Sequence, residues 1–210
     1  MKAGKKVIVI HVKDDIEKEE LMKEIQRLNL PAFIYVHGKL NSLKINIQGT
    51  KDEIREAMHK IRDIQKRVHA RLYTGKKGLY EYTLEDIFRG SQITVAAPIL
   101  LKALELIGEK VSFDGEKLKT SLPWEDIVQL SRKLGDALSQ IALQTTRQIR
   151  EVAIPVAVAY NLDAEEVLDK LVELGLAEFK EDKFKYELIK NKEQALEELI
   201  KSLEGEEDEN

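Results

Sequence analysis

The stretch AFIYVHGKLNSLKINIQGTKDE, residues 32–53, decides the fold of the first part of the chain. Its second half places Leu43, Ile45 and Ile47 in alternation with polar residues, which is the pattern of a strand with one buried face. Residues 32–37 are rich in aromatic and β-branched side chains and read as a second strand. A short turn that contains glycine separates the two runs, so the sequence predicts a β-hairpin.

A long helix is expected directly after this hairpin. Gly49 ends the strand, and Thr50 with Glu53 three residues later has the spacing of a capping box. An apolar stripe at helical spacing then continues to about Tyr73. The stripe consists of Ile54, Met58, Ile61, Val68 and Leu72.

The residues before the hairpin add one strand and one helix. Lys6–Val12 (KVIVIHV) is a β-branched run, and Asp14 or Asp15 can cap an amphipathic helix that ends before Pro31. Residues 1–77 are therefore expected to form a βαββα two-layer sandwich, with two helices on one face of a small sheet. Several RNA-binding modules have such an architecture, as do many unrelated domains, so the fold alone does not assign a function.

Charge is distributed unevenly along the 210 residues, although the net charge is only -4. Residues 1–77 contain 18 Lys and Arg against 10 Asp and Glu, a net charge of +8. Residues 78–150 have a net charge of -1, and residues 151–210, with 7 basic and 18 acidic residues, have -11. A basic first part favours a polyanionic partner such as nucleic acid, whereas ion-pair networks on a solvated surface are the alternative.

The second helix and the loop after it carry the candidate nucleic-acid-binding residues. Between Lys60 and Lys77 the only acidic residue is Asp63. Cations are favoured in the last turn of a helix, but this run extends over several turns, so we expect it to contact a phosphate backbone. A solvated basic face is the alternative. The candidate residues are Lys60, Arg62, Lys66, Arg67, Arg71, Lys76 and Lys77.

Gly75-Lys76-Lys77-Gly78 also matches the GxxG loop of KH domains, which clamps phosphates. Two glycines at the end of a long helix are more often a C-cap and a connector, and we prefer that interpretation. The sequence reveals no set of stacking aromatic or base-reading side chains, so no sequence specificity is predicted.

The middle segment, residues 78–143, is expected to be a helix-hairpin-helix unit, which either completes the N-terminal sandwich or forms a small α/β unit of its own. Thr83 caps a short helix, Pro98 begins an apolar one, and Asp114-Gly115 is typical of a type I′ hairpin turn. A long helix follows Pro123, and Trp124 at its start is expected to anchor the core.

Residues 144–204 have the element order of a winged helix, and residues 205–210 are expected to be a disordered acidic tail. Pro155 should kink or restart the first helix, and the wing is expected to turn at Glu181-Asp182. The helix after Asp163 is rich in carboxylates, which disfavours contact with DNA phosphates and favours contact with a protein. Leu176 and three wing aromatics would form its core or an interface. These aromatics are Phe179, Phe184 and Tyr186.

No enzyme motif is present, and we expect neither catalysis, a cofactor, a bound metal nor a small-molecule substrate. The chain has no Cys, which excludes thiolate sites, and its apolar runs are too short to span a membrane. A charged content of 34% with abundant Glu and Lys is typical of thermophilic proteins, and we expect a cytoplasmic location.

The chain resembles an archaeal family of unknown function over nearly its full length. The resemblance lies in the βαββα start, the winged-helix-like end and the block PILLKALELIG…VSFDGEKLKTSLPWEDIVQLSRKL, residues 98–134. In size and bipartite character the chain is also similar to an archaeal ribosome dimerisation factor. That second resemblance implies a homodimer that pairs small ribosomal subunits in ribosome hibernation and hinders their joining to the large subunit.

We therefore expect an α+β protein that binds ribosomal RNA through its basic helix and a protein or second copy through its acidic C-terminal domain. A winged-helix DNA-binding transcription regulator is the alternative.

Overall fold

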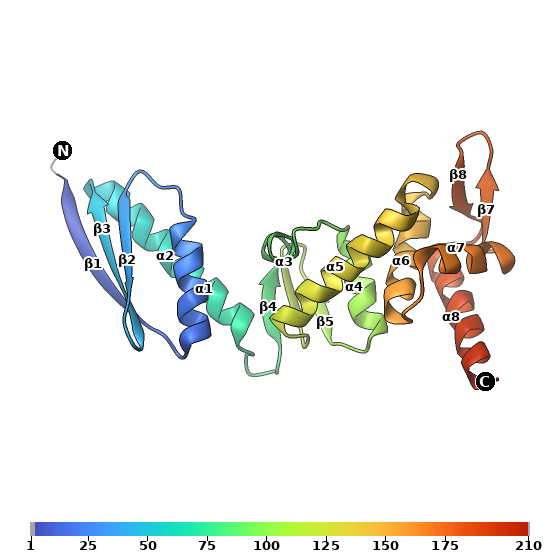
Figure 1. Ribbon diagram of the computed structural model, residues 1–210, viewed down its shortest axis with the longest axis horizontal. Coiled ribbons are helices and arrows are strands. Elements are labelled where there is room, and N and C mark those ends of the chain that lie inside the picture. Colours follow the sequence, from blue (N-terminus) through green and yellow to red (C-terminus); the bar gives the residue numbers. More distant parts are fainter. Residues whose placement is uncertain (1–2, 210) are drawn as a thin grey trace. The chain divides into compact units, whose positions relative to one another are not determined.

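The computed structural model describes residues 3–209 and has the expected α+β fold (Figure 1). The chain forms two compact units, Met1–Glu81 (unit 1) and Tyr82–Asn210 (unit 2). From residue 82 onward, the expected segments 78–143 and 144–204 pack together within unit 2, chiefly through contacts of α4 and α5 with α6. Residues 1, 2 and 210, at the ends of the expected domains, lie outside the described residues.

Unit 1 has the predicted βαββα order. It consists of β1 (Gly4–His11), α1 (Asp15–Gln26), β2 (Phe33–Gly38), β3 (Ser42–Gly49) and α2 (Lys51–Leu72). The strands form an antiparallel sheet with β3 in the centre, and both helices lie on the same side of it (Figure 1).

Side-chain caps fix where the two helices of unit 1 begin. The Asp14 carboxylate accepts a hydrogen bond of 2.8 Å from the Glu17 N–H, and Thr50 Oγ1 accepts one of 3.3 Å from the Glu53 N–H. These caps satisfy backbone donors that have no partner within the helix. They confirm the helix starts expected from the sequence.

The core of unit 1 lies between the helices and one face of the sheet. Leu43, Ile45 and Ile47 point to the helices from β3 and are fully buried. They pack with buried residues of both helices and of the other strands. These include Ile10, Leu21, Ile25, Ile61, Ile64 and Val68.

Unit 2 begins with a small sheet and three helices. Its elements are β4 (Tyr80–Thr83), in which the chain passes from unit 1 to unit 2, α3 (Leu84–Ser91), α4 (Ala97–Leu106), β5 (Val111–Phe113), β6 (Lys117–Thr120) and α5 (Trp124–Ile141). Strand β6 lies between β4 and β5. The helix-hairpin-helix order of α4, β5, β6 and α5 agrees with the prediction, whereas β4 was not predicted.

The β5–β6 turn differs from the predicted type. A type I′ turn needs a positive φ at both central residues. The Asp114 N–H donates a hydrogen bond to the Lys117 carbonyl, so the two central residues of this turn are Gly115 and Glu116. Only Gly115, with φ of 99°, is positive, which is the glycine-first pattern of a type II′ turn. Asp114 lies just before the two central residues and is not one of them. Its carboxylate accepts hydrogen bonds from the N–H groups of Glu116 and Lys117. These two hydrogen bonds lower the pKa of Asp114.

The rest of unit 2 has the expected helix-helix-hairpin-helix order. A short 3-10 helix, η1 (Ala142–Gln144), precedes α6 (Arg147–Ala159), α7 (Ala164–Glu173), β7 (Ala177–Lys180), β8 (Lys185–Leu188) and α8 (Lys192–Asp208). Helix α6 is buried at Ile149 and over residues 151–157, and it packs against α4, α5, α7 and α8. It continues through Pro155 without restarting, and it ends at Ala159, two residues before Asn161, whose φ is positive.

Two features of the C-terminal part differ from the sequence-based expectation. The β7–β8 hairpin has a four-residue loop, 181–184, rather than a two-residue turn. Helix α8 reaches Asp208, through most of the tail expected to be disordered. Its last turns have partners on other helices, since Tyr160 donates a hydrogen bond to Glu204 and Lys170 pairs with Glu206.

Candidate nucleic-acid interface

Five of the seven predicted cations of the α2 region are exposed. Lys60, Arg62 and Lys66 project from α2, and Lys76 and Lys77 lie in the loop after it. Lys60 pairs with Glu56 one turn earlier at 3.8 Å, an exposed contact that contributes little to stability.

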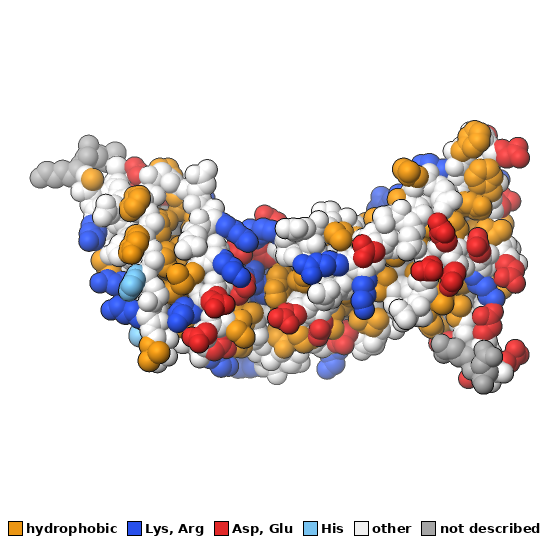
Figure 2. All heavy atoms as spheres, viewed as in Figure 1, with side chains coloured by type: hydrophobic (Ala, Val, Ile, Leu, Met, Phe, Trp, Pro, Cys, Tyr) orange, Lys and Arg blue, Asp and Glu red, His pale blue; other side chains and the backbone are white. Residues whose placement is uncertain are grey.

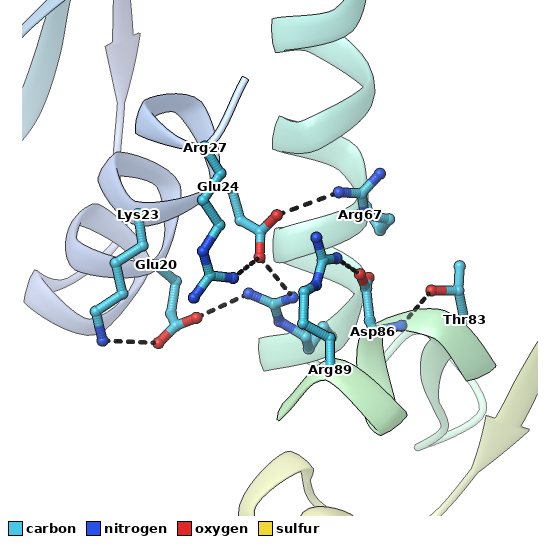
Figure 3. A network of polar contacts seen from close by, with 9 residues as sticks. Glu20, Lys23, Glu24, Arg27, Arg67, Thr83, Asp86 and Arg89 are labelled. Atoms are coloured by element: carbon cyan, nitrogen blue, oxygen red, sulfur yellow. Dashed lines mark hydrogen bonds and ion pairs between the residues drawn. The ribbon is translucent and has the colours of Figure 1, made fainter. Parts of the chain in front are cut away.

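The other two predicted cations point to α1 (Figure 3). Arg71 is only 3% exposed and lies 2.8 Å from a carboxylate oxygen of Glu20 and 3.6 Å from one of Glu24. Arg67 is 3.3 Å from the other carboxylate oxygen of Glu24, which is itself buried. The sequence placed Arg67 and Arg71 on an open basic face, and this is wrong for Arg71, because its guanidinium is buried between the helices.

Further polar contacts join the N-terminal part of α1 to the end of α2. His69 lies 3.4 Å from buried Glu17, and the Tyr73 hydroxyl donates a hydrogen bond of 2.5 Å to the Asp14 carboxylate. That hydrogen bond, together with one from the Glu17 N–H, lowers the pKa of Asp14. Burial and the neighbouring Asp14 raise the pKa of Tyr73. Part of the basic charge of α2 is therefore matched by the acids of α1 within unit 1.

The sheet of unit 1 has a second face, opposite the helices, that carries exposed aromatic side chains. Phe33 is 64% exposed and Tyr35 is 55% exposed, and His37 follows on the same face of β2. They alternate with Ile34 and Val36, which point to the helices because successive side chains of a strand face opposite sides.

Strand register extends this second face into three rows across the sheet. Phe33 lies beside Gln48 and Lys5, Tyr35 beside Asn46 and Val7, and His37 beside Lys44 and Val9. We call these nine side chains the open sheet face. They are Lys5, Val7, Val9, Phe33, Tyr35, His37, Lys44, Asn46 and Gln48.

The chemistry of the open sheet face suits a polyanion that carries flat rings. Aromatic rings stack with bases, Lys side chains contact phosphates, and the amides of Asn46 and Gln48 can donate and accept hydrogen bonds. Strands 4–11, 33–38 and 42–49 contain no Asp or Glu that would repel a phosphate. Figure 2 shows hydrophobic, His and Lys or Arg side chains interleaved over these strands, at the left of the view.

The sequence interpretation missed this arrangement of aromatics. The signal was the alternation in residues 32–37. The even-numbered positions are aliphatic, and the odd-numbered positions are Phe33, Tyr35 and His37. The two helices of unit 1 cover only one face of the sheet, so the side chains of the other set are exposed.

In unit 2 the hairpin β7–β8 (the wing) carries exposed aromatics. Phe179 and Tyr186 are cross-strand neighbours with ring centroids 5.1 Å apart, and Phe184 at the tip is 76% exposed with φ of 53°. Leu176 alone of the expected wing core is fully buried. Hydrophobic side chains gather at the tip of this hairpin in Figure 2.

Helix α3 of unit 2 begins with a cap, since Thr83 Oγ1 accepts a hydrogen bond of 3.1 Å from the Asp86 N–H (Figure 3).

Elsewhere in unit 2, buried Glu151 of α6 accepts hydrogen bonds from Lys192 at 2.5 Å and from Arg147 at 3.1 Å. Burial raises the pKa of Glu151, but the two cations outweigh it and leave the pKa below its ordinary value.

Within residues 3–209, no cluster of three or more His, Asp or Glu side chains could hold a metal ion. No described helix combines the length and the apolar character needed to cross a bilayer.

A family model matches residues 10–197, and its description is an uncharacterized protein conserved in archaea (DUF2067). No curated protein and no solved structure matches the chain.

Proposed function

The chain belongs to this archaeal family, and we propose that it is a non-enzymatic, ribosome-associated RNA-binding factor that contacts RNA through the open sheet face of unit 1. The observation that carries the proposal is the pair of exposed rings, Phe33 and Tyr35, on a sheet face without carboxylates.

The spacing of the two rings favours single-stranded RNA. Residues two apart on one strand are separated by about 7 Å, so Phe33 and Tyr35 can each hold one base of an extended strand. Bases in a duplex are already stacked and present no free face to such rings. Each base stacked on an aromatic side chain contributes about 1–3 kcal/mol to binding.

Cations supply the part of the affinity that does not depend on sequence. Lys5 and Lys44 lie on the open sheet face and can contact the phosphates beside the stacked bases. The exposed cations of α2 and its loop raise the positive potential of unit 1 and attract RNA from a distance. We assign them to this long-range role, since α2 covers the opposite side of the sheet.

The proposal gives unit 2 a protein partner, either a ribosomal protein or a second copy of the chain. Its exposed wing aromatics, Phe179 and Phe184, belong to a residue type that is enriched at protein interfaces. Contact of one copy with a small ribosomal subunit and with a second copy would give a dimerisation and anti-association factor of the kind involved in ribosome hibernation.

A winged-helix DNA-binding regulator is the second candidate, and the element order of α6, α7, β7, β8 and α8 favours it. Helix α7 opposes it. Its first turn carries Glu165 and Glu166, and Asp169 and Glu173 follow, so it would bring carboxylates to the phosphates.

Co-sedimentation of the full chain with ribosomal particles at increasing salt tests the proposal. The variant Lys5→Gln/Lys44→Gln should dissociate at lower salt than the wild type, because it loses phosphate contacts on the open sheet face. The control Lys76→Gln/Lys77→Gln removes the same charge from the loop after α2 and should stay bound to nearly the same salt concentration.

Two outcomes would contradict the proposal. One is a greater loss of binding in the loop variant than in the sheet variant, which would place the RNA on the helix side. The other is a wild-type chain that stays free of ribosomal particles and of single-stranded RNA but shifts duplex DNA, which would favour the regulator.

A further inference from the structure

A hollow of about 280 Å³ lies at the edge of the sheet of unit 1, next to the open sheet face. Its walls come from the end of α1 and from β2, and Tyr35 belongs both to the hollow and to the open sheet face. The lining includes Ile25, Gln26, Leu28, Ile34, Tyr35 and Val36.

Backbone polar groups of β2 point to this edge. The Lys39 N–H donates to the Ser42 carbonyl at 2.8 Å, which makes Lys39 and Ser42 a hydrogen-bonded pair. Hydrogen-bonded and non-hydrogen-bonded pairs alternate in an antiparallel ladder, so Tyr35 bonds to β3 whereas Ile34 and Val36 do not. Because β2 is an edge strand, the N–H and C=O groups of Ile34 and Val36 point away from β3.

The hollow thus combines aliphatic walls with polar groups at fixed positions. Leu28 and Ile34 supply apolar surface. The backbone of Ile34 and Val36 supplies donors and acceptors in one line, and the exposed side-chain amide of Gln26 can both donate and accept hydrogen bonds. A flat ring with donors and acceptors on its rim matches this arrangement. A peptide strand would use the backbone groups but leave the Gln26 amide without a role.

We propose that the hollow binds one nucleobase of the RNA strand that lies on the open sheet face, and reads it through Gln26 and the edge of β2. The inference rests on the proposed function, because Tyr35 joins the two surfaces and brings the next nucleotide of a strand stacked on it to the hollow. The open sheet face then provides affinity for any base, and the hollow provides selectivity.

Binding of the full chain to fluorescent ten-nucleotide RNAs of uridine, adenosine or cytidine tests this selectivity. The wild type should prefer one of the three by about tenfold, which is the discrimination expected for one well-placed pair of base hydrogen bonds. In Gln26→Ala the preference should fall to about twofold while binding persists, because stacking on Phe33 and Tyr35 remains. Gln148→Ala, the same change at an exposed site on α6, should keep the wild-type preference.

A second variant fills the hollow without removing a polar group. Leu28→Trp enlarges a partly buried residue of the hollow wall and should abolish the preference in the same way. Equal binding of the three RNAs by the wild type, or an unchanged preference in both hollow variants, would overturn the inference while RNA binding itself stands.

Crosslinking by a photoreactive analogue of the preferred base, placed in the same RNA, locates the base directly. Trypsin releases Glu24–Arg27, which contains Gln26, and Leu28–Lys39, which contains Phe33 and Tyr35. Crosslinks to both peptides are expected. Crosslinks to Leu28–Lys39 without Glu24–Arg27 would overturn the base-binding hollow alone, and crosslinks confined to unit 2 would overturn the proposed function as well.

Discussion

Arg71 shows how one residue type serves different purposes on the same helix. Its guanidinium is buried against Glu20 and Glu24, whereas Arg62 on the same helix is exposed. A buried carboxylate that loses its cation keeps an uncompensated desolvation cost. The pair therefore fixes α1 against α2 and is not available to a ligand.

Arg71→Met should lower the free energy of unfolding of unit 1 by about 2 kcal/mol, because Glu20 and Glu24 lose a buried cation while Arg67 still pairs with Glu24. Arg62→Met should change it by less than about 0.5 kcal/mol. Urea unfolding followed by far-ultraviolet circular dichroism measures both. Equal stability of the two variants would show that the α1–α2 contacts do not depend on this pair.

Glu151 should make the stability of unit 2 depend on pH. Its pKa in the folded chain is below the ordinary 4.5, so its stabilising contribution is present above that pH and is lost as the pH falls through the lowered value. Glu151→Gln should cost about 1 kcal/mol at pH 7 and progressively less below pH 4.5. Trp124 is the sole tryptophan and lies in unit 2, so its fluorescence in urea titrations reports this difference. A cost that stays constant between pH 7 and pH 3 would contradict the assigned ion pairs.

Individual site residues were harder to predict than the elements that carry them. The capping residues Thr50 and Thr83 were read correctly, because a cap involves neighbours in sequence. The partner of Arg67 is Glu24, 43 residues away, and no local pattern indicates that contact. Phe33 and Tyr35 were visible as an alternation, but their exposure depends on which face the helices cover.

At the scale of elements, Gly135 allows α5 to approach the segment that follows α3. A Cβ at this position would lie 2.3 Å from Cγ2 of Ile93, a branch of the side chain that cannot move away easily. Gly in a helix interior normally costs up to about 1 kcal/mol relative to Ala. At position 135 the missing side chain leaves room for Ile93, which offsets this cost.

Gly135→Ala should therefore destabilise unit 2 by about 1–3 kcal/mol, the usual cost of overpacking. Gly205→Ala in α8 meets no atom within 4 Å and should be neutral or stabilise by up to about 1 kcal/mol. Trp124 fluorescence in urea titrations measures the free energy of unfolding of both variants. Stabilisation by both would show that α5 and Ile93 can separate without cost.

Local patterns predicted the order of the elements, and tertiary contacts set their ends. Alternation in β3 and the helical stripe of α2 gave the βαββα order because each has one buried face. Helix α8 extended beyond the expected end because Lys170 and Tyr160, distant in sequence, hold its last turns. Pro155 did not restart α6, which is buried among four helices.

At the scale of the whole chain, the charge asymmetry seen in the sequence persists between the two units. Unit 1 is basic and unit 2 is acidic. Some cations of unit 1, such as Arg67 and Arg71, form ion pairs with acids of α1, whereas others are exposed. Net charge alone therefore indicated a polyanionic partner, which is the class that we propose. It did not indicate which surface of unit 1 would bind that partner. The proposed surface depends on the sheet and its two aromatic side chains.

The affinity of the full chain for single-stranded RNA, measured with Phe33→Ala/Tyr35→Ala over a range of salt concentrations, tests this account most directly. The double variant should bind about 100-fold more weakly at every salt concentration, with an unchanged salt slope, because it loses two stacked bases and no cation. Phe184→Ala, an exposed phenylalanine of the wing, should bind as the wild type does. Wild-type affinity in Phe33→Ala/Tyr35→Ala would contradict the central claim that RNA lies on the open sheet face.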